Sequence, residues 1–95
     1  MFKELNQLLH SELRLAIMSI LLSVEEADFV YIREKTAATA GNISVQIDKL
    51  SEAGYIVVER GFLGKRTRTV CKITEKGVLA FEEYVEALKS YLNVK

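Results

Sequence analysis

A short stretch in the second half of the chain concentrates the basic side chains. Residues 59–72 carry five basic residues and one acidic residue, although the 95-residue chain has no formal net charge. Clustered cations of this kind bind phosphate groups. We expect Lys65 to hold a phosphate, and Arg66 or Arg68, at the tip of a loop over 61–68, to enter a minor groove. An ordinary solvated hairpin is the alternative. The five basic residues are Arg60, Lys65, Arg66, Arg68 and Lys72.

A second set of candidate contacts lies on a predicted helix over 39–53. Its exposed positions are small and mostly uncharged, so they could enter a major groove without a steric clash. Asn42 or Gln46 could read an adenine edge, and Val45 could contact a thymine methyl group. Asp48 on the same face would repel phosphates or accept from a cytosine amino group, and simple solvation of this face is the alternative. The candidate DNA-binding residues of this helix are Thr39, Gly41, Asn42, Ser44, Val45, Gln46 and Lys49.

Local signals place these residues in a defined order of elements. Ser11, Thr39 and Thr74 are typical N-caps, and Gly54 suits the position after a helix. We therefore expect helices over 12–23, 28–36, 39–53 and 75–92, with the acidic residues 25–28 opening the second helix. Strands are expected over 55–60 and 69–73. The predicted fold is mainly α with a small β-hairpin (α+β): a helix-turn-helix over about 28–53 and a wing over about 56–73.

Apolar residues at the two ends of the chain predict an interface. Leu5, Leu8 and Leu9 share one face of a short helix expected over 3–9. In the last helix, apolar residues recur at spacings of three and four, as in a coiled-coil seam. We expect these terminal helices to form a homodimer, with packing of the last helix on its own core as the alternative. The seam residues are Val78, Phe81, Val85, Leu88 and Leu92.

Catalytic and metal-binding patterns are not evident in the sequence. His10 is the only histidine and Cys71 the only cysteine, so neither a metal-ligand pair nor a disulfide can be nominated. Cys71 is expected to be a small, half-buried side chain of the return strand. Residues 25–28 hold three carboxylates, which a helix N-terminus explains. We expect one domain over 1–95 that is not an enzyme, needs no cofactor or metal, and is cytoplasmic without a membrane segment.

Several motifs resemble those of prokaryotic winged-helix transcriptional regulators, in particular short single-domain proteins related to the MarR-like repressors. The resemblance implies dimers that bind palindromic operators, with the terminal helices at the interface. The chain departs from this family at Val45, Gln46 and Asp48, where basic residues are frequent, and at Ala37-Ala38, where a glycine is usual. The most specific motifs are Gly41-Asn42-Ile43-Ser44, Leu50-Ser51-Glu52-Ala53-Gly54-Tyr55 and Thr74-Glu75-Lys76-Gly77.

Two functions follow from these patterns. The first is a homodimeric regulator that binds double-stranded DNA, with an unidentified small-molecule effector as a further partner. The second is a winged-helix protein-interaction module without DNA binding. The neutral overall charge, Asp48 and the apolar pair Phe62-Leu63 favour the second. Phe62 and Leu63 are expected to pack under the wing, but at the tip they would form a protein-binding surface.

Overall fold

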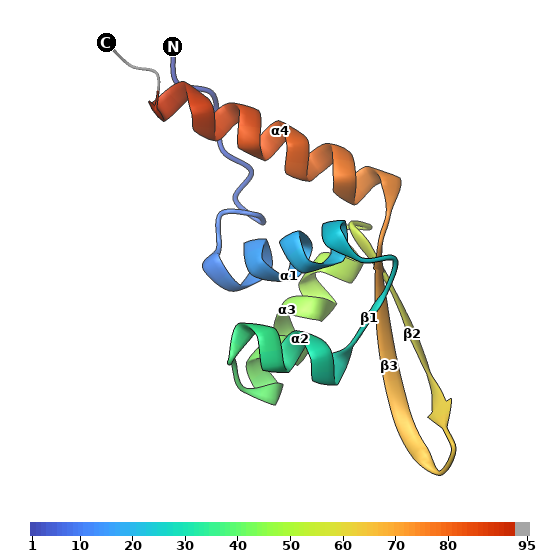
Figure 1. The fold of residues 1–95 in the computed structure, drawn as a ribbon. Coiled ribbons are helices and arrows are strands. Elements are labelled where there is room, and N and C mark those ends of the chain that lie inside the picture. Colours follow the sequence, from blue (N-terminus) through green and yellow to red (C-terminus); the bar gives the residue numbers. More distant parts are fainter. Residues whose placement is uncertain (93–95) are drawn as a thin grey trace.

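The computed structural model describes residues 1–92 and has the winged-helix fold that the sequence predicts (Figure 1). Helices surround one face of a three-stranded antiparallel sheet with the strand order β1-β3-β2. The elements are α1 (Glu12–Ser23), β1 (Ala27–Asp28), α2 (Phe29–Thr36), α3 (Ala40–Glu52), β2 (Ile56–Leu63), β3 (Arg66–Ile73) and α4 (Glu75–Leu92).

Side-chain caps begin the helices where the sequence places them. Ser11 accepts a hydrogen bond from Arg14 N (3.3 Å), and Thr39 accepts one from Asn42 N (3.2 Å). Thr74 likewise accepts from Gly77 N (3.0 Å). Each cap satisfies a backbone donor that has no partner within its helix. The three predicted N-caps are therefore confirmed.

The acidic segment before α2 differs from the prediction. Ala27 and Asp28 form a short strand, in which Ala27 pairs with Cys71 and Asp28 with Val70. Asp28 caps α2 by accepting from Tyr31 N (2.8 Å), so it precedes the helix rather than opening it. A two-residue strand has too little pattern to be recognised without knowledge of its pairing partner.

The N-terminal segment is not the helix that its leucine spacing predicts. It runs alongside α4 and makes a turn at residues 7–9 before α1 (Figure 1). Lys3 N donates to Ser90 Oγ (3.0 Å), and Tyr91 OH donates to Lys3 O (2.9 Å). Leu9 is 0% exposed within its own chain, so the prediction that it contacts a dimer partner is wrong. We call residues 1–10 the arm.

The wing covers the predicted residues 56–73, but its two strands are longer than predicted. Its two strands pair from Ile56↔Ile73 out to Leu63↔Arg66, so most of the expected 61–68 loop is strand. Only Gly64 and Lys65 connect them. Gly64 has a positive φ of 65°, which suits the first position of a two-residue hairpin turn. The hairpin therefore holds its shape through backbone pairing along its whole length.

The core lies between α1, α2, α3, the sheet and the part of α4 up to Tyr84. Ile17, Ile43, Leu50 and Tyr84 are among the side chains buried there. Tyr84, rather than the predicted seam, marks the face of α4 that packs inward. The buried residues of α4 are Gly77, Tyr84 and Ala87.

The junction between the wing and α4 depends on a close approach of two backbones. Thr74 N donates to Tyr55 O (3.0 Å), and Thr74 Oγ1 donates to Gly54 O (2.7 Å). A Cβ atom on Gly77 would lie 2.2 Å from Tyr55 O, far inside van der Waals contact. Only glycine allows α4 to begin in this position, which explains why the Thr74–Gly77 motif ends with it.

Replacing Gly77 with alanine tests this constraint. We expect Gly77→Ala to lower the free energy of unfolding by about 2 to 3 kcal/mol, because the new methyl group forces the two backbones apart. Urea unfolding followed by circular dichroism measures the change. Gly41→Ala is the matched control: that helical glycine has open space around it, so alanine should raise stability by up to about 1 kcal/mol. Equal effects of the two substitutions would contradict the constraint.

The single cysteine is a core residue. Cys71 is 0% exposed on β3, more deeply buried than expected. Loss of hydration raises the pKa of its thiol to about 11, against a smaller opposing effect of the Arg60 charge. A buried thiol with a raised pKa carries little thiolate at neutral pH and reacts slowly.

The raised pKa predicts a pH-dependent contribution to stability. The unfolded thiol ionises near pH 9 and the folded one near pH 11, so its stabilising contribution is complete below pH 9 and falls as the pH rises toward 11. We expect the stability advantage of the native chain over Cys71→Ala to shrink by about 2 kcal/mol between pH 8 and pH 10.5. Urea unfolding of the native protein and of Cys71→Ala at both pH values measures this difference in stability. The other titrating groups are the same in the two proteins, so their contributions cancel. A constant difference would refute the prediction.

Candidate nucleic-acid interface

The helix-turn-helix exposes the beginning of α3. α2 ends at Thr36, and the next residue, Ala37, takes the left-handed conformation (φ 56°) that glycine usually supplies. Two residues later Thr39 caps α3, while Ile43 and Ile47 bury its inner face. The predicted contacts in the first two turns lie at the surface, except Gln46, which is half-buried. The exposed ones are Thr39, Gly41, Asn42, Ser44 and Val45, and Lys49 is exposed one turn later.

Gln46 is engaged within the chain. Its Oε1 accepts a hydrogen bond from Arg14 of α1, and its Nε2 donates to Asn42 Oδ1 (2.9 Å). Arg14 also donates from Nε to the carbonyl oxygen of Leu8 in the arm. Sequence reasoning missed Arg14 because a contact across 32 positions leaves no local pattern. The arm, α1 and α3 are therefore joined through one guanidinium group.

The opposite flank of α3 faces the wing. Asp48 Oδ1 lies 3.8 Å from Arg60 Nη2 of β2. Both side chains are about two-thirds exposed, so the pair contributes little to stability. It does account for the acidic residue on the predicted DNA-binding face, because Asp48 lies beside a wing cation.

Carboxylates also accompany two other wing cations. Arg68 Nε lies 3.6 Å from Asp28 Oδ2, where β1 runs beside β3. Lys72 Nζ lies 3.3 Å from Glu59 Oε1 and 3.8 Å from Glu26 Oε2. The acidic residues before α2 therefore face the basic strand of the wing. Arg68 pairs with Gly61 along the hairpin, so its predicted place at the tip is wrong.

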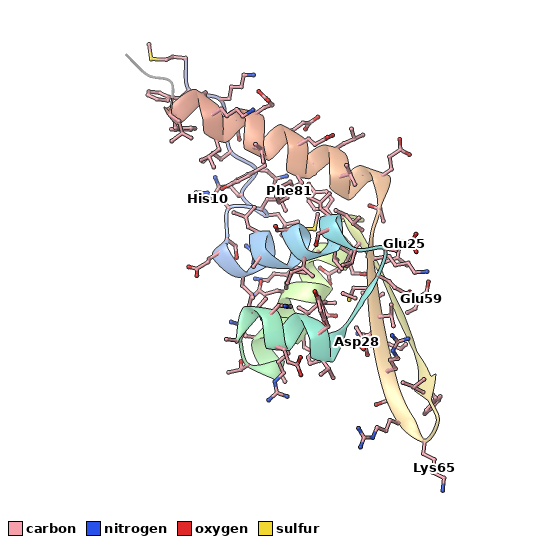
Figure 2. The ribbon with its side chains drawn as sticks, in the orientation of Figure 1. His10, Glu25, Asp28, Glu59, Lys65 and Phe81 are labelled. Atoms are coloured by element: carbon pink, nitrogen blue, oxygen red, sulfur yellow. The ribbon has the colours of Figure 1, made fainter. Side chains whose placement is uncertain are left out.

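Lys65 and Arg66 form the true tip of the wing. Both are exposed, and Lys65 extends from the end of the hairpin away from the body of the protein (Figure 2). Within residues 1–92, no carboxylate lies within ion-pair distance of either side chain. These two cations are therefore available to an external anion without first leaving a partner.

Two apolar side chains lie close to this tip. Phe62 is 76% and Leu63 68% exposed, so the expectation that they pack under the wing is wrong. Pairing of Phe62 with Thr67, and of Leu63 with Arg66, places the two on opposite faces of the hairpin. The wing consequently presents apolar as well as basic groups.

The predicted seam of α4 lies beside the face that packs on the core. Val78, Phe81 and Val85 are half-buried, while Leu88 and Leu92 are exposed. Leu5 and Leu8 of the arm are half-buried as well. The apolar stripe therefore continues beyond the part of α4 that its own core covers.

The described residues give little support for a histidine site, a metal site or a membrane-spanning helix. His10 Nδ1 lies 2.9 Å from Tyr84 OH, which gives this lone histidine a structural partner. Across residues 1–92, acidic, histidine and cysteine side chains nowhere gather in a group of three or more that could hold a metal ion. None of the helices described is long and apolar enough to cross a membrane.

Known proteins share this architecture. A curated, uncharacterized protein of Methanocaldococcus jannaschii is 32% identical over 90 residues, which cover 94% of this chain and 98% of the relative. The structure of a transcriptional regulator homologue from Pyrococcus horikoshii superposes with a TM-score of 0.84 and 28% identity, over 93% of this chain and 87% of that one. The transcriptional regulator BldR from Sulfolobus solfataricus gives 0.68 and 28%, over 87% and 58%.

The family model described as a winged helix DNA-binding domain matches residues 13–92. This range includes the helix-turn-helix, the wing and α4, the elements that carry the basic tip and the exposed turn of α3. The chain belongs to the family of winged helix DNA-binding domains.

Proposed function

We propose that this protein is a transcriptional regulator that binds specific sequences of double-stranded DNA as a homodimer. One observation carries the proposal: the first turn of α3 and the tip of the wing both lie on the side of the molecule remote from α4 (Figure 1). A helix and a cationic hairpin with a common orientation can engage one duplex together. The relatives described as transcriptional regulators support this function.

The proposed binding mode assigns different tasks to the two elements. The first turns of α3 enter the major groove, where small side chains such as Gly41 and Ser44 let the helix approach the bases. Lys65 contacts a phosphate, and Arg66 reaches the adjacent minor groove. Arg60 and Arg68 each lie beside a carboxylate, of α3 and β1 respectively, and are less available to phosphate than the two cations of the tip.

The proposed dimer joins the α4 seams of two chains. The C-terminal end of α4 extends past the body beside the arm, and Leu88 and Leu92 are exposed there (Figure 1). A second copy would cover this stripe, together with Leu5 and Leu8. Two α3 helices one turn of DNA apart, about 34 Å, would then read two half-sites.

Within the described residues, a hollow of about 340 Å³ between the arm and α4 is the location we propose for the effector.

An alternative function rests on Phe62 and Leu63. Their exposure favours a protein-interaction module, because a partner protein could cover the apolar side chains that the wing presents on its two faces. Both proposals are non-enzymatic. The response of binding to salt separates them, since phosphate contacts release counterions and apolar contacts do not.

Neutralising the wing tip tests the proposed DNA contacts. We expect Lys65→Gln combined with Arg66→Gln to weaken binding to duplex DNA and to reduce the salt slope by at least about 1 per protomer, since Lys65 is the proposed phosphate contact and each such contact contributes about 0.9. Fluorescence anisotropy across a salt series, with a random-sequence duplex and the duplex upstream of the protein's own gene, measures both quantities.

The matched control for this experiment is Lys76→Gln combined with Lys89→Gln, which removes the same charge from α4. It should leave the salt slope unchanged. An unchanged slope in the wing variant would refute the proposed contacts. Absence of binding to either duplex at low salt would favour the protein-interaction module.

A charge in the α4 seam tests the homodimer. We expect Leu88→Glu to convert a dimer into a monomer, because two carboxylates would be buried at a symmetric contact without partners. Light scattering coupled to size-exclusion chromatography measures the mass. Leu79→Glu is the control, because Leu79 is exposed on the other side of α4. A dimer that tolerates the first variant, or is lost in the second, would place the interface elsewhere.

A further inference from the structure

Arg14, Gln46 and Asn42 form a chain of hydrogen bonds that ends at the DNA-facing surface. Arg14 donates to Gln46 Oε1, and Gln46 Nε2 donates to Asn42 Oδ1 at 2.9 Å. Arg14 and Gln46 are half-buried, whereas Asn42 is exposed in the first turn of α3. This series of hydrogen bonds therefore leads from the interior to Asn42, a residue placed to meet a base.

The donor-to-acceptor direction of these hydrogen bonds follows from the chemistry of Arg14. A guanidinium group can only donate hydrogen bonds, so the atom of Gln46 that faces Arg14 must be the amide oxygen. The amide nitrogen of Gln46 then faces Asn42 and must donate to its oxygen. Asn42 is left with its NH2 group directed outward.

We propose that Arg14 is a specificity-determining residue that, through Gln46, makes Asn42 present its NH2 group to DNA as a hydrogen-bond donor. The inference rests on the proposed function and identifies the bases that the site would select. Arg14 acts as a positioning residue, because it reaches Asn42 only through Gln46.

The position of Arg14 is itself fixed. Its Nε donates to the carbonyl oxygen of Leu8, so the guanidinium group is tied to the arm as well as to α3. Within residues 1–92, no carboxylate lies within ion-pair distance of Arg14 to compete for it. The direction of the hydrogen bonds is consequently set by Arg14, whose side chain can only donate.

An outward-facing donor distinguishes among bases in the major groove. Guanine offers N7 and O6 as acceptors, adenine N7 and thymine O4, whereas cytosine offers only its N4 amino group. Cytosine would therefore face Asn42 donor to donor. The two-bond adenine contact expected of asparagine is weakened too, because Oδ1 already accepts from Gln46. We expect exclusion of cytosine, rather than strict choice of adenine, at the contacted base.

The substitution Gln46→Glu should reverse this preference. One carboxylate oxygen would accept from Arg14, and the other would offer an acceptor to Asn42. Asn42 would then turn its NH2 group inward and its oxygen outward, toward the amino groups of cytosine or adenine. Binding to a library of randomised duplexes, followed by sequencing, reports base preferences. We expect a roughly five- to tenfold shift toward cytosine at one position in each half-site.

Three further variants separate positioning from charge and folding. Lys49→Gln changes the charge of α3 by the same amount as Gln46→Glu, and should weaken binding without altering the preference. Arg14→Lys keeps a donor facing Gln46 and should retain the native preference. Arg14→Met removes the donor while keeping the apolar stem, and should flatten the preference at that one position.

Nuclear magnetic resonance of the free protein supplies a readout that does not need DNA. In the native chain and in Arg14→Lys, one Gln46 side-chain amide proton should be protected from exchange, and Arg14→Met should abolish this protection. Lack of protection in the native chain would overturn the proposal. So would a library preference that Gln46→Glu and Arg14→Met leave unchanged. If the native chain enriches no duplex at all, the proposed DNA-binding function fails, and this inference fails with it.

Discussion

The close approach of Gly77 to the Tyr55 carbonyl oxygen governs how the parts of this protein are arranged. The missing Cβ lets α4 start directly against Tyr55, in the connection between α3 and β2. Thr74 fixes the same junction through hydrogen bonds to Gly54 and Tyr55. Tyr55 extends the junction to the arm, because its hydroxyl accepts from Asn6 Nδ2 (2.9 Å). The end of α3, the base of the wing and the start of the proposed dimer helix therefore meet at one point.

Much of the fold could be predicted because its signals are local. A cap such as Thr39 or a helix-ending glycine such as Gly54 (φ 79°) satisfies its requirement within a few residues, so the sequence alone reveals it. The strand at Ala27–Asp28 and the conformation of the arm depend instead on contacts with β3 and α4. Tertiary contacts there override the local pattern, as the leucines of the arm illustrate.

The candidate site was predictable in its composition and less so in its geometry. The concentration of cations in the wing is visible in the sequence, but the carboxylates beside Arg60 and Arg68 come from α3 and β1. The exposed turn of α3 follows from helical periodicity, whereas the bond from Arg14 to Gln46 joins residues 32 apart. Ala37 in a left-handed conformation has no local signal at all, since alanine seldom adopts it. Pairings between distant elements thus decide which side chains are free to bind.

Because the molecule is elongated, a small rotation at one end produces a large displacement at the other. It extends 57 Å along its longest axis and only 25 and 21 Å across, with the free end of α4 and the tip of the wing at opposite ends (Figure 1). In a dimer joined through α4, a rotation of roughly 5° at the joint would displace a point 57 Å away by about 5 Å, more than the 3.4 Å rise of one base. Small rotations at this joint would therefore shift the tip of the wing by more than the spacing of stacked base pairs.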